Sequence, residues 1–86
     1  MDVAALVQQA RQQVTELTGM PAEAVTGLRR DDGGWTVTVE ALELARVPST
    51  MDVVGTYEIT LSDEGRLLGL RHVGRHRRSA TDQGGS

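Results

Sequence analysis

A chain of 86 residues accommodates one domain, and a domain of this size buries only about 60% of the surface that its unfolded chain exposes. The chain contains no cysteine, which excludes a disulfide scaffold and thiolate zinc sites. Its formal net charge is -3, but residues 66–86 hold five of the nine basic residues, all arginine, against one acid, so the C-terminal end is the basic end.

The first predicted element is an amphipathic helix that ends at Thr18 and Gly19. Apolar residues recur at spacings of three and four with glutamines between them, which indicates a helix with one buried face. Gly19 favours the end of the helix because glycine adopts the left-handed conformation without a steric penalty. Residues 21–25, with Pro21 in front, predict a short second helical turn. The apolar positions of the first helix are Val3, Leu6, Val7, Ala10, Val14 and Leu17.

From Leu28 onward the apolar period changes to two, which predicts strands. The "DDGG" segment at residues 31–34 indicates a hairpin turn, and alternating residues follow it from Trp35 to Val39. The alternation then slips by one residue between Val39 and Leu42. A phase change within a strand indicates a β-bulge, so we expect one at that point.

The next strand runs through Val53 and Leu61, and Gly55 marks a bend or a close approach within it. The "SDEG" turn at residues 62–65 leads to a last strand that becomes rich in arginine. The sequence therefore predicts an α+β fold, in which an N-terminal amphipathic helix and a short helical turn pack on a three- to four-stranded antiparallel β-meander. We expect a single domain over residues 1–78 and a disordered polar tail over residues 79–86.

The acidic and histidine residues do not form a recognisable catalytic or metal-binding pattern. The acids at residues 31–32 and 63–64 lie in turns, where short polar side chains stabilise the local backbone. Glu40, Glu43 and Glu58 are expected to face solvent or to pair with arginines of neighbouring strands. His72 and His76 could share one strand face, but no third ligand is suggested nearby. We predict no enzyme activity, no cofactor and no metal.

The basic C-terminal strand admits two interpretations. Clustered arginine is typical of phosphate binding, but Trp35 and Tyr57, the only aromatic residues besides histidine, are expected to lie in the core instead of stacking on bases. Arginine on an edge strand also prevents edge-to-edge aggregation and can contact an acidic partner. We therefore favour edge protection or acidic-partner docking over nucleic-acid binding.

The segment "ELARVPSTMDVVGTYEI" at residues 43–59, together with "DEGRLLGLRHVGRHRR" at residues 63–78, resembles the gas vesicle synthesis protein O (GvpO) family. The resemblance extends from the N-terminal helix to Arg78. The chain departs from the family at His76, where relatives usually carry an aromatic residue. Residues that match the family's central pattern are Glu43, Leu44, Arg46, Val47, Pro48, Asp52, Val53, Tyr57 and Glu58.

What the resemblance implies is a non-enzymatic accessory role in forming gas vesicles. Such proteins resemble assembly factors that contact other accessory proteins, among them an AAA-type ATPase (GvpN), and the shell protein. The N-terminal sequence "MDVAALVQQARQQ" has neither a basic start nor a continuous apolar run, so we expect a cytoplasmic protein without a membrane span.

If the chain binds partners, seven positions are predicted to lie on the surface and contact them. A proline-fixed loop is preorganised for recognition, and arginine offers bidentate contacts to carboxylates. The loop at residues 47–52 could equally be an ordinary strand connection. A PepSY-like interaction module and a nucleic-acid-binding regulator are the alternative functions, and the oligomeric state stays open, a homodimer included. The predicted contact residues are Arg46, Pro48, Asp52, Arg71, Arg75, Arg77 and Arg78.

Overall fold

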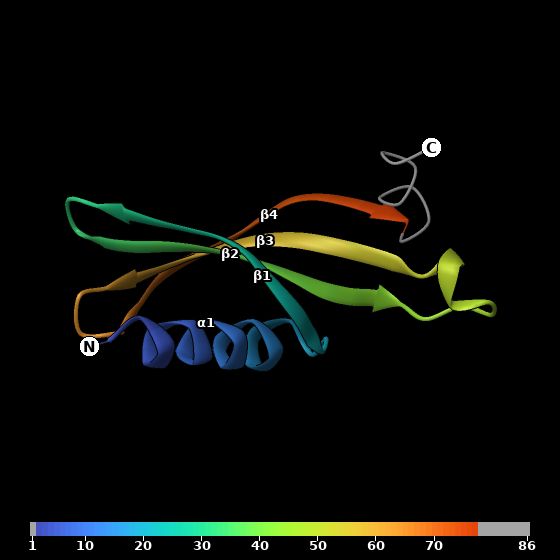
Figure 1. Ribbon diagram of the computed structural model, residues 1–86, viewed down its shortest axis with the longest axis horizontal. Coiled ribbons are helices and arrows are strands. Elements are labelled where there is room, and N and C mark those ends of the chain that lie inside the picture. Colours follow the sequence, from blue (N-terminus) through green and yellow to red (C-terminus); the bar gives the residue numbers. More distant parts are fainter. Residues whose placement is uncertain (1, 78–86) are drawn as a thin grey trace.

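The computed structural model describes residues 2–77, which form one helix packed on one face of an antiparallel sheet (Figure 1). The four strands lie in the order β1-β2-β3-β4, so each strand pairs with its neighbour in sequence. This arrangement confirms the predicted α+β fold. The elements are α1 (Val3–Thr18), β1 (Ala22–Asp31), β2 (Gly34–Leu44), the 3-10 turn η1 (Ser49–Met51), β3 (Val53–Ser62) and β4 (Leu67–Arg77).

Helix α1 begins and ends with local hydrogen bonds that its sequence supplies. The Asp2 side chain accepts a hydrogen bond from the Ala5 amide at 2.8 Å, which satisfies one of the free amides of the first turn. At the other end Gly19 adopts the left-handed conformation with φ of 75° and donates its amide to the Thr15 carbonyl. The predicted helix and its glycine stop are therefore confirmed.

The prediction of a second helical turn over residues 21–25 is wrong, because this segment begins strand β1. Ala22 pairs with Ala41 of β2, and the Leu42 amide donates to the Pro21 carbonyl at 3.0 Å. A five-residue helix would gain little, since nucleating a helix is unfavourable. Pairing along β2 satisfies the backbone of the same residues, so tertiary structure overrides the local signal.

The core lies between α1 and the two central strands. Every fully buried large side chain comes from these three elements, and all of them face one another across the helix-sheet interface. Such burial of apolar surface is the main favourable term in folding. The core residues are Leu6, Ala10 and Val14 of α1, Val37, Val39 and Ala41 of β2, and Tyr57, Ile59 and Leu61 of β3.

The β-bulge in β2 exists, but it lies nearer the end of the strand than the sequence suggested. Ala41 is completely buried and continues the core-facing row, so the alternation does not slip after Val39. The register against β3 shifts instead between Leu42 and Leu44, which makes Glu43 the extra residue of the bulge. The sequence pattern missed that the core-facing row continues to Ala41, because it counted only large apolar residues.

Helix α1 covers only part of the sheet. Strands β2, β3 and β4 continue past the C-terminal end of the helix, toward the loop that joins β2 to β3 (Figure 1). We call this uncovered part, formed by residues 42–57 and 72–77, the distal end of the sheet. Apart from Tyr57, no residue there belongs to the core beneath the helix, so other contacts must stabilise the strands.

Replacing Leu6 by alanine tests the helix-sheet core. Leu6 is 1% exposed, so we expect the free energy of unfolding to fall by about 2–5 kcal/mol, through lost apolar burial and a cavity. The matched control is Leu17→Ala on the same helix, where the side chain is 51% exposed and the change should stay within about 0.5 kcal/mol. Urea denaturation followed by circular dichroism measures both, and equal losses would contradict the packing described.

Candidate functional site

The bulge in β2 places the Glu43 carboxylate over the distal end of the sheet. The bulge directs this side chain across β3 at Gly55, where a Cβ atom would occupy the space that the carboxylate fills. The side chain of Glu43 is only 11% exposed. A glycine at this position therefore makes room for an acid within the sheet surface.

Three side chains surround the Glu43 carboxylate and offset the cost of taking it out of water. The Tyr57 hydroxyl donates a hydrogen bond to Oε2 at 2.9 Å. His72 Nε2 lies 3.1 Å from the same oxygen, and Arg75 Nε lies 3.3 Å from Oε1. This cluster, which we call the Glu43 cluster, joins β2 to β3 and β4 at the distal end of the sheet.

Tyr57 connects the Glu43 cluster to the core. Its ring packs against the His72 ring with centroids 4.8 Å apart, and its hydroxyl lies 4.0 Å from the Met20 sulfur. Burial and the adjacent Glu43 carboxylate both raise the pKa of the phenol above its ordinary value of 10.0. The stability that the protonated Tyr57 contributes is therefore complete below pH 10.0 and is lost as the pH rises through the raised pKa of the folded state.

The loop between β2 and β3 is held by its own hydrogen bonds. Asp52 is 6% exposed, and its Oδ1 accepts a hydrogen bond from the Arg46 amide at 2.7 Å. The Met51 amide donates to the Pro48 carbonyl at 2.9 Å, and the Val47-Pro48 peptide bond is cis. In the loop held by these hydrogen bonds, the Val47 side chain points outward and is 99% exposed.

The structure places the predicted contact residues in different surroundings. Arg46 and Pro48 lie in the exposed loop, and Arg77 lies at the adjoining end of β4, where it pairs with Val53. Asp52 is buried, so the expectation that it lies on the surface is wrong: its carboxylate is used to close the loop. Arg78 lies outside the described residues.

Arg75 and Arg71 lie on opposite faces of the sheet. Arg75 joins the Glu43 cluster, whereas Arg71 pairs with Glu58 at 2.7 Å on the face that carries no helix in the described part of the chain. The Glu58-Arg71 pair confirms that a strand acid contacts an arginine of the neighbouring strand, whereas Glu43 of β2 reaches Arg75 of β4 across β3. Neither arginine is left unpaired by these contacts. They also lower the positive potential of β4, which does not favour the nucleic-acid interpretation.

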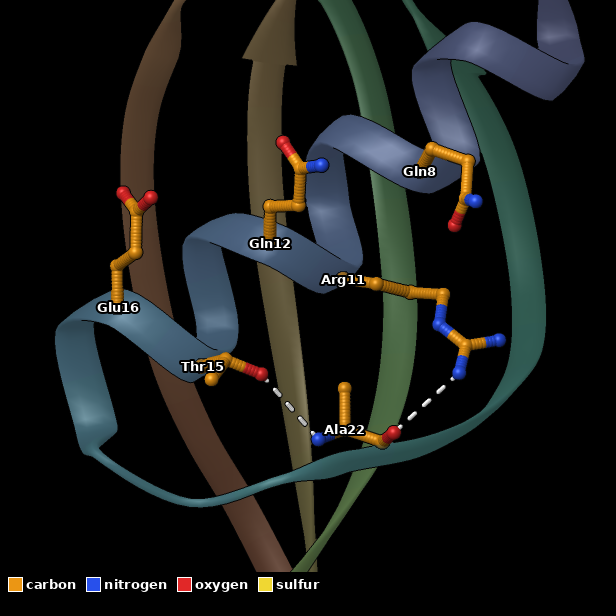
Figure 2. Close-up of a pocket in the computed structure, with 6 residues that line it drawn as sticks. All are labelled: Gln8, Arg11, Gln12, Thr15, Glu16 and Ala22. Atoms are coloured by element: carbon orange, nitrogen blue, oxygen red, sulfur yellow. Dashed lines mark hydrogen bonds between the residues drawn. The ribbon is translucent and has the colours of Figure 1, made fainter.

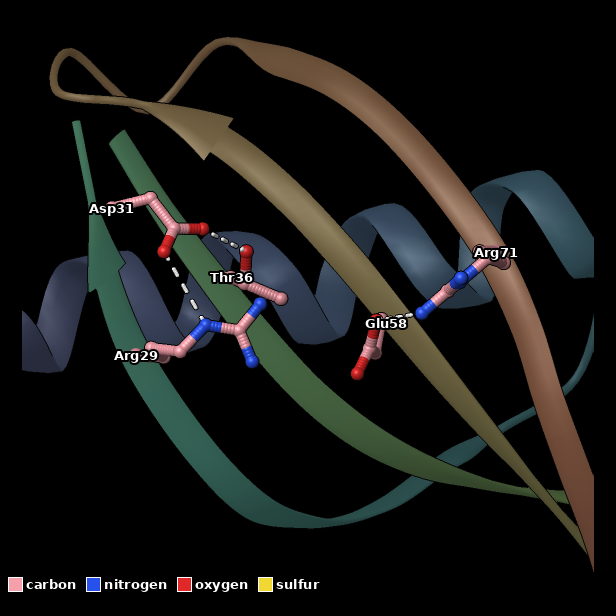
Figure 3. Close-up of polar contacts among 5 residues, drawn as sticks. All are labelled: Arg29, Asp31, Thr36, Glu58 and Arg71. Carbon is pink, nitrogen blue, oxygen red and sulfur yellow. Dashed lines mark hydrogen bonds and ion pairs between the residues drawn. The ribbon is translucent and has the colours of Figure 1, made fainter. Parts of the chain in front are cut away.

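Asp31 and Arg29 form a second polar contact on the open face of the sheet (Figure 3). Thr36 donates a hydrogen bond to Asp31 Oδ2 at 3.0 Å, and Arg29 Nε lies 3.3 Å from Oδ1. These two hydrogen bonds, that from Thr36 foremost, lower the pKa of the Asp31 carboxyl. A shallow hollow of about 400 Å³ lies over these residues and the Glu58-Arg71 pair. Ion pairs this exposed contribute little to stability.

A second hollow, of about 320 Å³, lies between α1 and the start of β1 (Figure 2). Its polar groups already bind the backbone of Ala22, because Arg11 donates to the Ala22 carbonyl and the Ala22 amide donates to the Thr15 hydroxyl, each at 3.3 Å. Among residues 2–77, no three histidine or carboxylate side chains gather closely enough to hold a metal ion.

Sequence reasoning missed the Glu43 cluster, although each member was visible. Glu43 and Tyr57 were predicted separately, as a strand acid and as a core residue, and His72 was considered only as a metal ligand. The available signal was Gly55, because a glycine within a strand indicates a close approach. What could not be read from the sequence was which side chain makes that approach.

Residues 2–77 form a small α+β domain with a polar cluster at one end of its sheet. No helix in that part of the chain has the length and hydrophobicity of a membrane span. The family model described as "Gas vesicle synthesis protein GvpO" matches residues 1–82. The chain belongs to the GvpO family, which is a family of gas vesicle accessory proteins.

Named relatives agree with this assignment. The chain is 49% identical over 71 residues to "Gas vesicle protein O" of Streptomyces sp. (strain CB03234), an alignment that covers 83% of this chain and 56% of the relative. It is 36% identical over 69 residues to "Gas vesicle protein O1" of Halobacterium salinarum, covering 80% of this chain and 58% of the relative. The chain thus spans little more than half the length of these relatives, and no solved structure matches it.

Replacing Gly55 by alanine tests whether the glycine makes room for Glu43. The added methyl group would displace the carboxylate from its partners, and we expect a loss of about 1–3 kcal/mol in the free energy of unfolding. Gly69→Ala on β4 is the control, because a Cβ there has open space around it. Thermal or urea denaturation compares the two, and equal stabilities would show that the Glu43 carboxylate does not occupy this position.

Replacing Glu43 by glutamine tests the effect of its charge on Tyr57. The pKa of the phenol should fall toward 10.0 but stay above it, because burial, the larger cause, remains. Tyr57 is the only tyrosine, so phenolate absorbance during a pH titration reports on it alone. Glu40→Gln, on the other sheet face, should leave the titration unchanged, and an unchanged pKa in Glu43→Gln would refute the contact.

Proposed function

We propose that this chain is a non-enzymatic accessory protein in gas vesicle formation and acts as a protein-protein interaction module during shell assembly. Membership of the GvpO family supports the gas vesicle role. The size of the domain supports the interaction role, because a core this small leaves a narrow stability margin that a bound partner would increase.

The observation that carries the interaction role is the loop between β2 and β3. Its buried acid and its backbone are bonded internally, while Arg46, Val47 and Pro48 face outward. A loop ordered before binding loses less conformational entropy when a partner docks. The polar groups of the neighbouring Glu43 cluster bind one another and leave no nucleophile beside a free base, so the arrangement favours a contact surface over catalysis.

The proposed partners are other gas vesicle accessory proteins, with the AAA-type ATPase (GvpN) as the leading candidate, and the shell protein. The proposed contact residues are Arg46 and Pro48 of the loop with Arg75 and Arg77 of β4. Arg71, on the other face of the sheet, and Arg78 would extend the basic surface. Asp52 would act indirectly, by holding the loop. We propose that this assembly takes place in the cytoplasm.

Co-purification from gas vesicle-forming cells tests this function. A tagged full chain should retain gas vesicle proteins, and Arg46→Ala should reduce their recovery without lowering the melting temperature, since its side chain is exposed. Asp52→Ala should lower both, because it removes the acceptor for the Arg46 amide. Arg66→Ala, an exposed arginine in the turn before β4 at the other end of the sheet, is the matched control.

Two results would contradict the proposal. If the wild-type chain retains no gas vesicle protein, the interaction role is wrong. If Asp52→Ala loses stability yet retains partners as well as the wild type does, the loop is an ordinary strand connection and docking takes place elsewhere.

A further inference from the structure

Exposed apolar side chains lie at the distal end of the sheet together with arginines that form no ion pair within residues 2–77. Val47 is 99% exposed, Leu44 46% and Met51 37%. Arg46 belongs to the same loop, and Arg77 lies in register with Val53, the β3 partner of Leu44. We call Leu44, Arg46, Val47, Met51 and Arg77 the distal surface.

The distal surface lies where α1 does not reach. Strands β2, β3 and β4 extend beyond the end of the helix (Figure 1), so no helix of the described chain covers their helix-side face there. Apolar residues grouped on an exposed surface with a charged rim are typical of a protein interaction site. Val47 has the geometry of an anchor, because the hydrogen-bonded loop holds it away from the protein.

At the distal end of the sheet, the acidic side chains are engaged in contacts within the domain, whereas two arginine side chains are available to a partner. Both of its carboxylates are engaged, Glu43 with Tyr57, His72 and Arg75, and Asp52 with the Arg46 amide. The nearby Glu40, on the other face of the sheet, lies beside His76 at 3.9 Å. Neither the Arg46 nor the Arg77 guanidinium makes an ion pair within residues 2–77. A partner therefore meets exposed arginine and apolar side chains, with the acids shielded.

We propose that the distal surface binds an acidic protein segment that carries apolar side chains, supplied by another gas vesicle protein. Apolar side chains of the segment would cover Val47 and Leu44, and its carboxylates would pair with Arg46 and Arg77, whose planar guanidinium groups match carboxylate geometry. This inference rests on the proposed function and adds the chemistry of the partner. A second copy docked through the same surface would place arginine against arginine, which is unfavourable.

A photo-reactive benzophenone amino acid at position 47 of the full chain tests the proposal in gas vesicle-forming cells. Position 47 is exposed enough to accept it without disturbing the fold. Mass spectrometry of the cross-linked peptide identifies the segment in contact. We expect an apolar segment with net negative charge from another gas vesicle protein, and a cross-link yield about tenfold lower when Arg46 and Arg77 are both replaced by glutamate.

The control carries the same amino acid at position 68, where Leu68 is 55% exposed near Arg66 at the other end of the sheet; it should not capture that segment. A cross-link from position 47 to a basic segment, to a second copy of this chain or to lipid, or no cross-link at all, would overturn the inference. Failure of this inference can be distinguished from failure of the proposed function, because in the second case the wild-type chain would co-purify with no gas vesicle protein.

Discussion

The burial of the Glu43 carboxylate is the constraint on which the distal end of the structure depends. Helix α1 supplies a core for only part of the sheet, and β2, β3 and β4 run beyond it. Glu43 joins these three strands through Tyr57, His72 and Arg75. A buried acid is costly unless its partners satisfy it, so the bulge at Glu43, the space at Gly55 and the three partners form one interdependent unit.

The residues of the central family pattern have two roles. Some hold the backbone in place, and others present side chains on the distal surface. Glu43 and Tyr57 hold the strands, and Asp52 closes the loop through the Arg46 amide. Because these contacts hold the loop backbone in place, the side chains of Arg46 and Val47 face outward. A short segment can thus combine a rigid support with a contact surface, which is a physical reason for its fixed spacing.

Sequence periodicity was sufficient for the helix, for β3 and for the meander, because large apolar residues mark the core there. It failed at residues 21–25, where the pairing of Ala22 with Ala41 outweighs a weak helical signal, and at the bulge, where Ala41 is core despite its small size. The prediction that Asp52 is exposed was also wrong, since the burial of a short acid depends on which backbone amide donates a hydrogen bond to it. The resemblance of the central segment was sufficient to predict the family. Predicting the Glu43 cluster would have required the register of β2, β3 and β4, which the sequence pattern does not give.

Amide hydrogen exchange of the Glu43→Ala variant tests most directly whether Glu43 holds the distal end. Exchange reports local opening, so a loss confined to part of the sheet is visible by position. We predict faster exchange at the paired amides of residues 53–57 and 72–77, with little change at Val37, Val39 and Ile59, which lie under α1. Unchanged protection at the distal end, or an equal loss across the whole sheet, would contradict this account.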